Sequence, residues 1–200
     1  MKNLVKIMVI TVFVLSLTSC KLLSKAEAKA GYDYIMKNLH NSVSNQTNGN
    51  PTDTDAVKST STKSNEVIVS DSNESGVYVG LAFTDIPLSN KLKLQPEINF
   101  IGVKDFNQIQ TPILLKYKIS DKFNLYTGPS FEFLLDAPQN IKSFNFALDF
   151  GVSYDILNNF LIEARYDWGQ SNLLEGGNSD NSFKINHFQI GFAYKFGSKK

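Results

Sequence analysis

The sequence predicts an all-β fold: a small up-and-down antiparallel transmembrane β-barrel of eight strands, preceded by a signal peptide and a disordered linker. Three observations support this prediction. Seven C-terminal segments alternate apolar and polar residues with a period of two, as strands with one apolar face do. The connections between these segments alternate between short and long. The chain is also 12% aromatic, almost entirely Phe and Tyr, and both residue types favour strands and membrane interfaces.

The first twenty residues, MKNLVKIMVITVFVLSLTSC, predict a targeting segment. A basic start precedes an apolar run from Ile7 to Leu17, which is shorter than the roughly 20 residues that span a bilayer. Residues 1–19 are therefore interpreted as a signal peptide. The LTSC sequence that ends at Cys20 resembles the bacterial lipobox, and this resemblance implies a lipid anchor on Cys20. The alternative is an ordinary signal peptide cleaved after Ala30.

Cys20 is the only cysteine of the chain, so it cannot form an internal disulfide. Lipid chains on this residue would hold the protein to a membrane surface without making it span the membrane.

Residues 20–64 are predicted to be a tether between the signal peptide and the barrel. From Lys21 to about Val43, good helix formers and a weak apolar stripe predict a modest helix. Residues 44–64 consist mainly of Ser, Thr, Asn and Asp, with almost nothing to bury, which predicts a disordered linker. The barrel domain is accordingly predicted to span residues 65–200.

Seven segments of this domain alternate clearly and are predicted to be strands. They are 77–86, 92–100, 109–119, 123–135, 144–156, 160–168 and 188–196. A barrel in lipid leaves no strand edge unpaired, because an unsatisfied backbone group there is costly. The eighth strand is therefore expected from Asn65–Ser70.

The connections predict how the strands are arranged. Residues 88–90, 120–122 and 157–159 form tight turns, whereas 104–108, 136–142 and 173–182 form longer polar loops. In an up-and-down meander every second connection falls at the same end, so the tight turns share one end and the long loops the other. This pattern is typical of outer-membrane barrels, with periplasmic tight turns and chain ends and outward-facing loops. A water-soluble sandwich or calyx remains the alternative.

The inner face of the predicted strands mixes small residues with charges of both signs, which suits a crowded barrel lumen. The charged positions are Glu97, Lys116, Lys118, Glu132, Asp149, Glu163, Arg165 and Asp167. An eight-stranded barrel is just wide enough to be filled by side chains. We therefore expect a paired network rather than a conducting pore. Trp168, Tyr166, Tyr154 and Tyr194 are expected in aromatic girdles at the membrane interfaces.

Four pieces of sequence resemble one family, in order: GVYVGLAFTDIPLSNKLKLQPEINF, TPILLKYKISDKFNLYTGPSFEFLL, FALDFGVSYDILNNFLIEARYDWG and HFQIGFAYKF. Together, residues 77–196 resemble the PorT-like outer-membrane β-barrel domain of Gram-negative bacteria. The resemblance implies an eight-stranded barrel in the outer membrane and allows a role in protein secretion. Two features depart from the family pattern: a short first strand without glycines, and the extension of residues 197–200.

Catalytic and metal sites are not predicted. His187 with Ser153 and Glu163 is the combination closest to a hydrolase, yet a lumen histidine hydrogen-bonded to a neighbour is the better interpretation. Two histidines far apart in sequence and one cysteine provide no metal-ligand spacing. The loop around Asp180 offers a single carboxylate, a thin ligand set for calcium.

The sequence therefore predicts a non-enzymatic outer-membrane barrel, lipid-anchored at Cys20, with a structural or assembly- and secretion-associated role in the envelope. Its expected partners are outer-membrane lipid and other envelope or secretion proteins. No cofactor is expected, and a formal net charge of +1 gives no indication of nucleic-acid binding. The alternatives are a lipid-anchored soluble β-barrel that binds a small ligand or partner and, less favoured, an outer-membrane lipid hydrolase.

Overall fold

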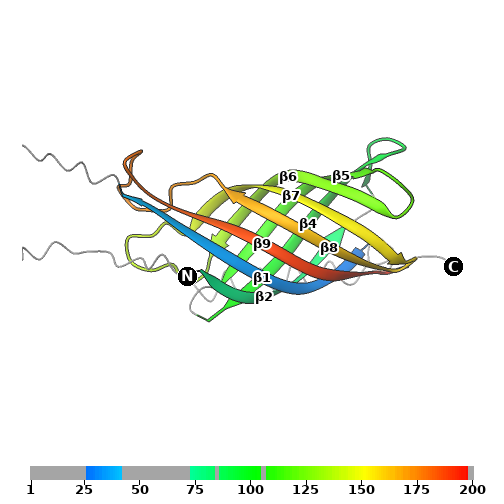
Figure 1. The fold of residues 1–200 in the computed structure, drawn as a ribbon, viewed down its shortest axis with the longest axis horizontal. Coiled ribbons are helices and arrows are strands. Elements are labelled where there is room, and N and C mark those ends of the chain that lie inside the picture. Colours follow the sequence, from blue (N-terminus) through cyan, green and yellow to red (C-terminus); the bar gives the residue numbers. More distant parts are fainter. Residues whose placement is uncertain (1–25, 42–72, 84–85, 105–106, 198–200) are drawn as a thin grey trace, which may run out of the picture.

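The computed structural model describes residues 26–41, 73–83, 86–104 and 107–197, which form an antiparallel β-barrel (Figure 1). The strands are β1 (Ala26–Asn41), β2 (Glu74–Phe83), β3 (Ile86–Pro87), β4 (Leu92–Val103), β5 (Gln108–Lys118), β6 (Phe123–Leu134), β7 (Phe144–Leu157), β8 (Phe160–Gly169) and β9 (Asn181–Lys195). Within these ranges, no helix is long and apolar enough to cross a bilayer.

The sheet closes on itself. Neighbouring strands follow the order β2-β1-β9-β8-β7-β6-β5-β4, and a further pairing of β2 with β4 completes the ring. The two-residue strand β3 pairs with the start of β4, beyond the end of β2, and adds no further strand to the ring. Eight long strands in the described part of the chain therefore form a closed up-and-down barrel, as predicted.

The strand that closes the barrel corrects the prediction for the tether. β1 occupies Ala26–Asn41, within the segment expected to be helical, so both the helix and the domain boundary at residue 65 are wrong. β1 pairs with β2 on one side and with β9 on the other, where the register runs from Glu27 with Lys195 to Asn41 with Asn181. These ladders satisfy backbone groups that would otherwise face lipid, and this gain overrides local helix propensity. Asn65–Ser70, the expected eighth strand, lies outside the described residues.

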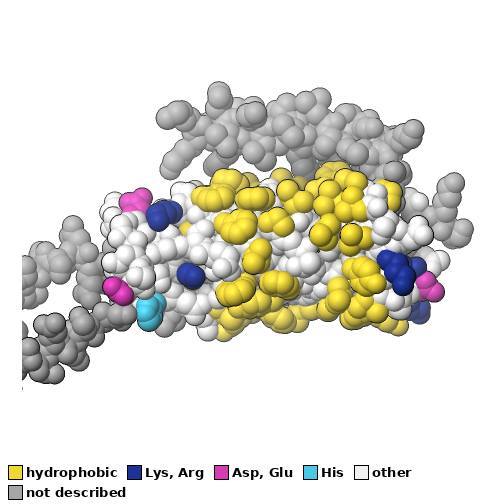
Figure 2. Space-filling view, turned by 90° about the horizontal axis from the view of Figure 1, so that it is seen from above, with side chains coloured by type: hydrophobic (Ala, Val, Ile, Leu, Met, Phe, Trp, Pro, Cys, Tyr) yellow, Lys and Arg dark blue, Asp and Glu magenta, His cyan; other side chains and the backbone are white. Residues whose placement is uncertain are grey.

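The two faces of the wall have opposite character, as the alternation predicted. From Phe144 to Tyr154, the even-numbered side chains point outward and the odd-numbered side chains point inward, where Asn145, Asp149 and Ser153 are buried. Exposed apolar side chains cover the outside as a broad belt (Figure 2). The predicted girdle residues lie on this outer face: Tyr154, Tyr166, Trp168 and Tyr194. The belt has the composition of a lipid-facing surface.

On β9, the polarity of the two faces reverses near the end with the long loops. Toward the tight turns, β9 places His187 and Gln189 inside and Ile190 and Phe192 outside. Beyond His187, the inner side chains are apolar and the outer ones are polar. The inner pair is Phe183 and Ile185, and the outer pair is Lys184 and Asn186.

The inner apolar side chains at the loop end form an apolar cap over the lumen. Its members are Ile35, Tyr78, Ile101, Val103, Leu134, Ile141, Leu173, Leu174, Phe183 and Ile185. Leu173 and Leu174 come from the connection between β8 and β9, which folds over the mouth of the barrel. An apolar interior under a polar exterior is the arrangement of a water-soluble protein, so the loop end of β9 is expected to extend beyond the lipid belt.

β1 and β2 lie on either side of the low-complexity tract in the sequence. β1 ends and β2 begins at the same end of the barrel as the long loops, since Ile35 pairs with Glu74 there. A barrel strand thus precedes residues 44–64 in the chain, and the predicted linker itself lies outside the described residues. Residues 1–25, including the predicted signal peptide and Cys20, lie outside the described part of the chain, as do residues 44–64.

Candidate functional site: the filled lumen

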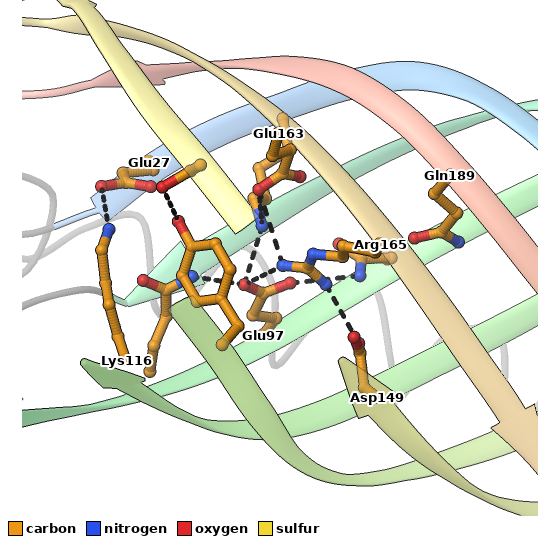
Figure 3. Close-up of polar contacts among 12 residues, drawn as sticks. Glu27, Glu97, Lys116, Asp149, Glu163, Arg165 and Gln189 are labelled. Atoms are coloured by element: carbon orange, nitrogen blue, oxygen red, sulfur yellow. Dashed lines mark hydrogen bonds and ion pairs between the residues drawn. The ribbon is translucent and has the colours of Figure 1, made fainter. Parts of the chain in front are cut away.

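The centre of the lumen holds a buried ion cluster, which we call the Arg165 cluster (Figure 3). Glu97 Oε1 lies 2.8 Å from Lys29 Nζ and 2.5 Å from Arg165 Nη2. Lys29 Nζ also lies 2.8 Å from Glu163 Oε2, and Arg165 Nη1 lies 3.3 Å from Asp149 Oδ2. These charged side chains are at most 2% exposed. Two cations thus balance most of the charge of three carboxylates, which come from three different strands.

Neutral donors complete the cluster. Gln95 Nε2 donates to Glu97 Oε1 at 2.5 Å, Asn99 Nδ2 donates to Glu97 Oε2 at 3.3 Å, and the Tyr78 hydroxyl donates to Glu163 at 3.0 Å. Buried charges are tolerable only when paired and hydrogen-bonded in this way. Gly191 makes room for the Tyr78 ring, because a Cβ there would overlap the hydroxyl. The expected mixture of small and charged inner residues is therefore a packing requirement of the network.

One tyrosine ring is surrounded by cations on the tight-turn side of this cluster. The Tyr126 ring centroid lies 5.9 Å from Lys29 Nζ, 5.2 Å from Lys116 Nζ and 5.5 Å from Arg165 Cζ. Lys116 Nζ is also 3.8 Å from the buried Glu27 carboxylate. Cation–π contacts gain strength when desolvated, so the ring helps to hold three like charges close together.

A second network surrounds His187. Its Nδ1 lies 3.0 Å from Asp33 Oδ2, and its Nε2 lies 2.9 Å from Gln108 Nε2. A carboxylate and a side-chain amide thus lie at the two nitrogens of the imidazole ring. Gln110 Nε2 donates to Glu132 at 3.0 Å and to Asp167 at 2.9 Å. Both ring nitrogens of His187 are therefore occupied by lumen neighbours, as the sequence interpretation expected.

The residues considered for a hydrolase do not assemble into a triad. Ser153 lies opposite Glu163 across β7 and β8, but its hydroxyl accepts from Tyr126 at 2.7 Å. Glu163 faces Gly191, four residues along β9 from His187. At about 3.3 Å per residue, this places His187 roughly 13 Å from the Ser153 and Glu163 pair. The side chains hold separate places in the lumen network, without the nucleophile–base contact that hydrolysis requires.

The lumen is filled by side chains. The apolar cap covers the loop end, and Ala82, Leu161 and Ala193 are buried near the tight turns. The predicted inner charges take part in the contacts described above, apart from Lys118, which lies exposed at the rim and pairs with Asp121 at 2.7 Å. The arrangement matches the paired network predicted for a barrel of this size.

The metal candidates remain unsupported. Among the described residues, no group of three or more His, Cys, Asp or Glu side chains could hold a metal ion. In the loop considered for calcium, Asn178 Oδ1 accepts from the backbone N–H groups of Asp180 and Asn181, both at 2.9 Å. The Asn178 side-chain oxygen therefore stabilises the turn through these two hydrogen bonds and does not act as a cation ligand.

Sequence reasoning missed the contribution of β1 to the lumen. Glu27, Lys29 and Asp33 are buried and central to the networks, yet all three lie in the segment expected to be helical. A signal was present, since from residue 27 to 34 the odd positions hold Glu, Lys, Gly and Asp while the even positions hold only Ala and Tyr. Gly31 also disfavours a helix.

Comparison with known proteins supports the class of protein that the fold indicates. Residues 103–175 match the outer membrane protein beta-barrel domain family. The closed barrel and its apolar belt agree with this match, which supports an outer-membrane β-barrel with membrane-spanning strands. The narrower PorT-like relationship stays a prediction. A search of curated proteins gave no match.

Several solved structures have a similar strand arrangement. Neisserial surface protein A has 11% identity and a TM-score of 0.48, with 86% of this chain and 97% of that chain covered. The attachment invasion locus protein Ail of Yersinia pestis has 13% identity and a TM-score of 0.43, with the same coverage. A de novo designed transmembrane β-barrel has 13% identity and a TM-score of 0.45, covering 85% and 94%. At these values the three structures carry no information on function.

Proposed function

We propose that this chain is a non-enzymatic outer-membrane barrel with a structural or assembly- and secretion-associated role, acting through its surfaces. The observation that carries the proposal is the filled lumen. Arg165, Glu97 and His187 are bonded to inner-wall neighbours, and the apolar cap covers the mouth above them. An interior used in this way stabilises the wall and leaves the rims and loops for contact with other molecules.

Deletion with complementation tests this role. We expect loss of the chain to reduce secretion or outer-membrane protein assembly while the phospholipid and lipopolysaccharide composition stays unchanged. A His187→Gln variant, which keeps a hydrogen-bonding side chain in the lumen, should restore the phenotype. Heat-modifiable migration on gels verifies that the variant folds. Altered envelope lipids that wild type restores and His187→Gln does not would instead support the hydrolase.

The proposed orientation places the tight turns, the start of β1 and the end of β9 in the periplasm. This choice is supported by the contrast between three short turns and the longer connections at the other end. It would put the connection of residues 42–73 at the cell surface. An epitope inserted into this connection should bind antibody on intact cells, whereas one inserted at Ser89–Asn90 should bind only after permeabilisation. The reverse labelling pattern would overturn the orientation.

Lipidation of Cys20 is the second part of the proposal. Five residues separate Cys20 from Ala26, where β1 begins, and such a spacer reaches at most roughly 20 Å. The lipid would therefore lie in the leaflet beside the tight turns. The alternative cleavage after Ala30 would remove Lys29, which contacts both Glu97 and Glu163.

Mass spectrometry of the mature N-terminus tests the anchor. We expect a diacylated Cys20 in the wild type and an unprocessed or unlipidated chain for Cys20→Ala. The variant should stay in the membrane after carbonate extraction, because the strands hold it there. Release of Cys20→Ala by carbonate would support the soluble ligand-binding alternative, although that alternative requires a polar exterior and the barrel has an apolar one.

A further inference from the structure

Three exposed lysines gather on one side of the rim that carries the tight turns. Lys91 directly precedes β4, and Lys118 and Lys122 flank the turn between β5 and β6. We call these three residues the basic sector. The Lys118 N–H donates to the Lys91 carbonyl at 2.8 Å, so the two turns are adjacent. Figure 2 shows lysine and arginine side chains gathered at this end of the molecule, beyond the apolar belt.

The described acidic groups near the basic sector do not neutralise it. Asp121 pairs with Lys118 at 2.7 Å, and this hydrogen bond lowers the pKa of the Asp121 carboxyl. The Asp155 carboxylate forms an ion pair with Lys195, with 2.6 Å between Asp155 Oδ1 and Lys195 Nζ. Among the described residues, the three lysines of the sector thus share one carboxylate.

The opposite end of the barrel has no such excess in the described residues. Its four lysines are Lys37, Lys104, Lys142 and Lys184, and its four carboxylates are those of Glu74, Asp136, Glu175 and Asp180. Lys37 forms an ion pair with Glu74, and Lys142 donates to the Asn172 carbonyl at 3.0 Å. The positive charge is therefore a feature of the tight-turn end.

The basic sector lies at the edge of the lipid belt. Tyr117 and Ile119, in and just after β5, are 44% and 49% exposed on the outer wall, and Tyr154 is 43% exposed. Lys122 Nζ lies 6.0 Å from the Tyr154 ring centroid. Tyrosines at a membrane boundary mark the headgroup level, where lysines extend their ammonium groups toward the polar region.

We propose that the basic sector binds the phosphates of anionic phospholipid headgroups in the leaflet that surrounds the tight turns. The apolar belt lies directly below the lysines. One lipid molecule would therefore contact the lysines through its headgroup and the belt through its acyl chains. Anionic headgroups would then fix the tilt and depth of the barrel from this one side of its rim.

Lipid selectivity in nanodiscs tests this proposal and does not depend on the orientation in cells. The full chain is placed in phosphatidylcholine nanodiscs containing a minor fraction of spin-labelled lipid. The association constant of labelled phosphatidylglycerol is measured relative to labelled phosphatidylcholine. The test variant is Lys91→Gln with Lys122→Gln, and the matched control is Lys104→Gln with Lys184→Gln at the loop end. Heat-modifiable migration verifies that each variant folds.

We expect wild type to prefer phosphatidylglycerol and the test variant to lose that preference by up to roughly fivefold for each lysine removed. The control variant should behave as wild type, and added salt should weaken the preference by screening. Inorganic phosphate at matched ionic strength should act like chloride. The proposal is overturned if wild type has no preference, if both variants lose it equally, or if free phosphate displaces the lipid.

Discussion

The two halves of β9 differ in which face of the strand is polar and which is apolar. From His187 to Lys195 the strand places polar side chains in the lumen and apolar ones against lipid, whereas from Asn181 to Asn186 the arrangement is reversed. β1 shows the same change, with Asp33 inside the polar part and Ile35 inside the apolar cap. The physical cause is the surrounding medium, because lipid removes the advantage of burying apolar groups and water restores it.

The interior of the barrel is therefore stabilised by two different forces. In the lipid-embedded part, ion pairs and hydrogen bonds connect the strands, and each depends on its partners. At the loop end, contact among Ile185, Phe183 and Leu173 gives an ordinary apolar core. The position of the change in polarity also marks the membrane boundary on β1 and β9.

Removal of the central guanidinium should have the largest effect. Arg165→Met leaves Glu97 and Asp149 buried without their main partner, and breaking a buried pair from one side costs about 3–5 kcal/mol. Urea unfolding of the barrel in lipid vesicles, followed by heat-modifiable migration, measures this loss. A double variant, Arg165→Met with Glu97→Gln, should recover part of the stability. An unchanged midpoint for Arg165→Met would show that the network does not stabilise the polar half.

A lysine scan along the outer face of β9 should locate the boundary with a smaller effect. Ile190→Lys places a charge against lipid and should destabilise the barrel by about 2–4 kcal/mol, whereas Asn186→Lys should cost at most about 1 kcal/mol. The same unfolding assay compares the two variants. Equal losses would mean that Asn186 is as deep in the membrane as Ile190, which contradicts a membrane boundary between the two residues.

Truncation in the apolar cap should have the smallest effect of the three. Ile185→Ala removes buried methyl groups and should destabilise the barrel by about 2 kcal/mol, at the low end for such changes because loop residues can relax. Ile185→Val, a milder truncation, should lose about 1 kcal/mol or less. Stability equal to wild type for Ile185→Ala would indicate that the cap is not a packed core.

Most of the wall could be predicted from the sequence. The alternation around Phe150 and Tyr166 assigned the correct face to each side chain in β7 and β8, because one shift in register would turn a whole apolar face inward. The filled lumen also followed from the mixture of glycines and opposite charges. The pairing partners did not, since Arg165 meets Glu97 from a strand 68 residues away. No local pattern encodes such a contact.

The sequence by itself determined that the chain makes a barrel with an apolar outside, a charged inside and two unlike ends, because period-two alternation and turn lengths are local properties. Only the tertiary structure decided which strand closes the ring. Ala26–Asn41 carries good helix formers. Its extended form becomes stable only through backbone hydrogen bonds to β2 on one side and β9 on the other. That closure brought Lys29 and Asp33 into the lumen and placed the end of β1 beside the start of β2 at the loop end. Both results depend on contacts between distant segments, which no window of sequence contains.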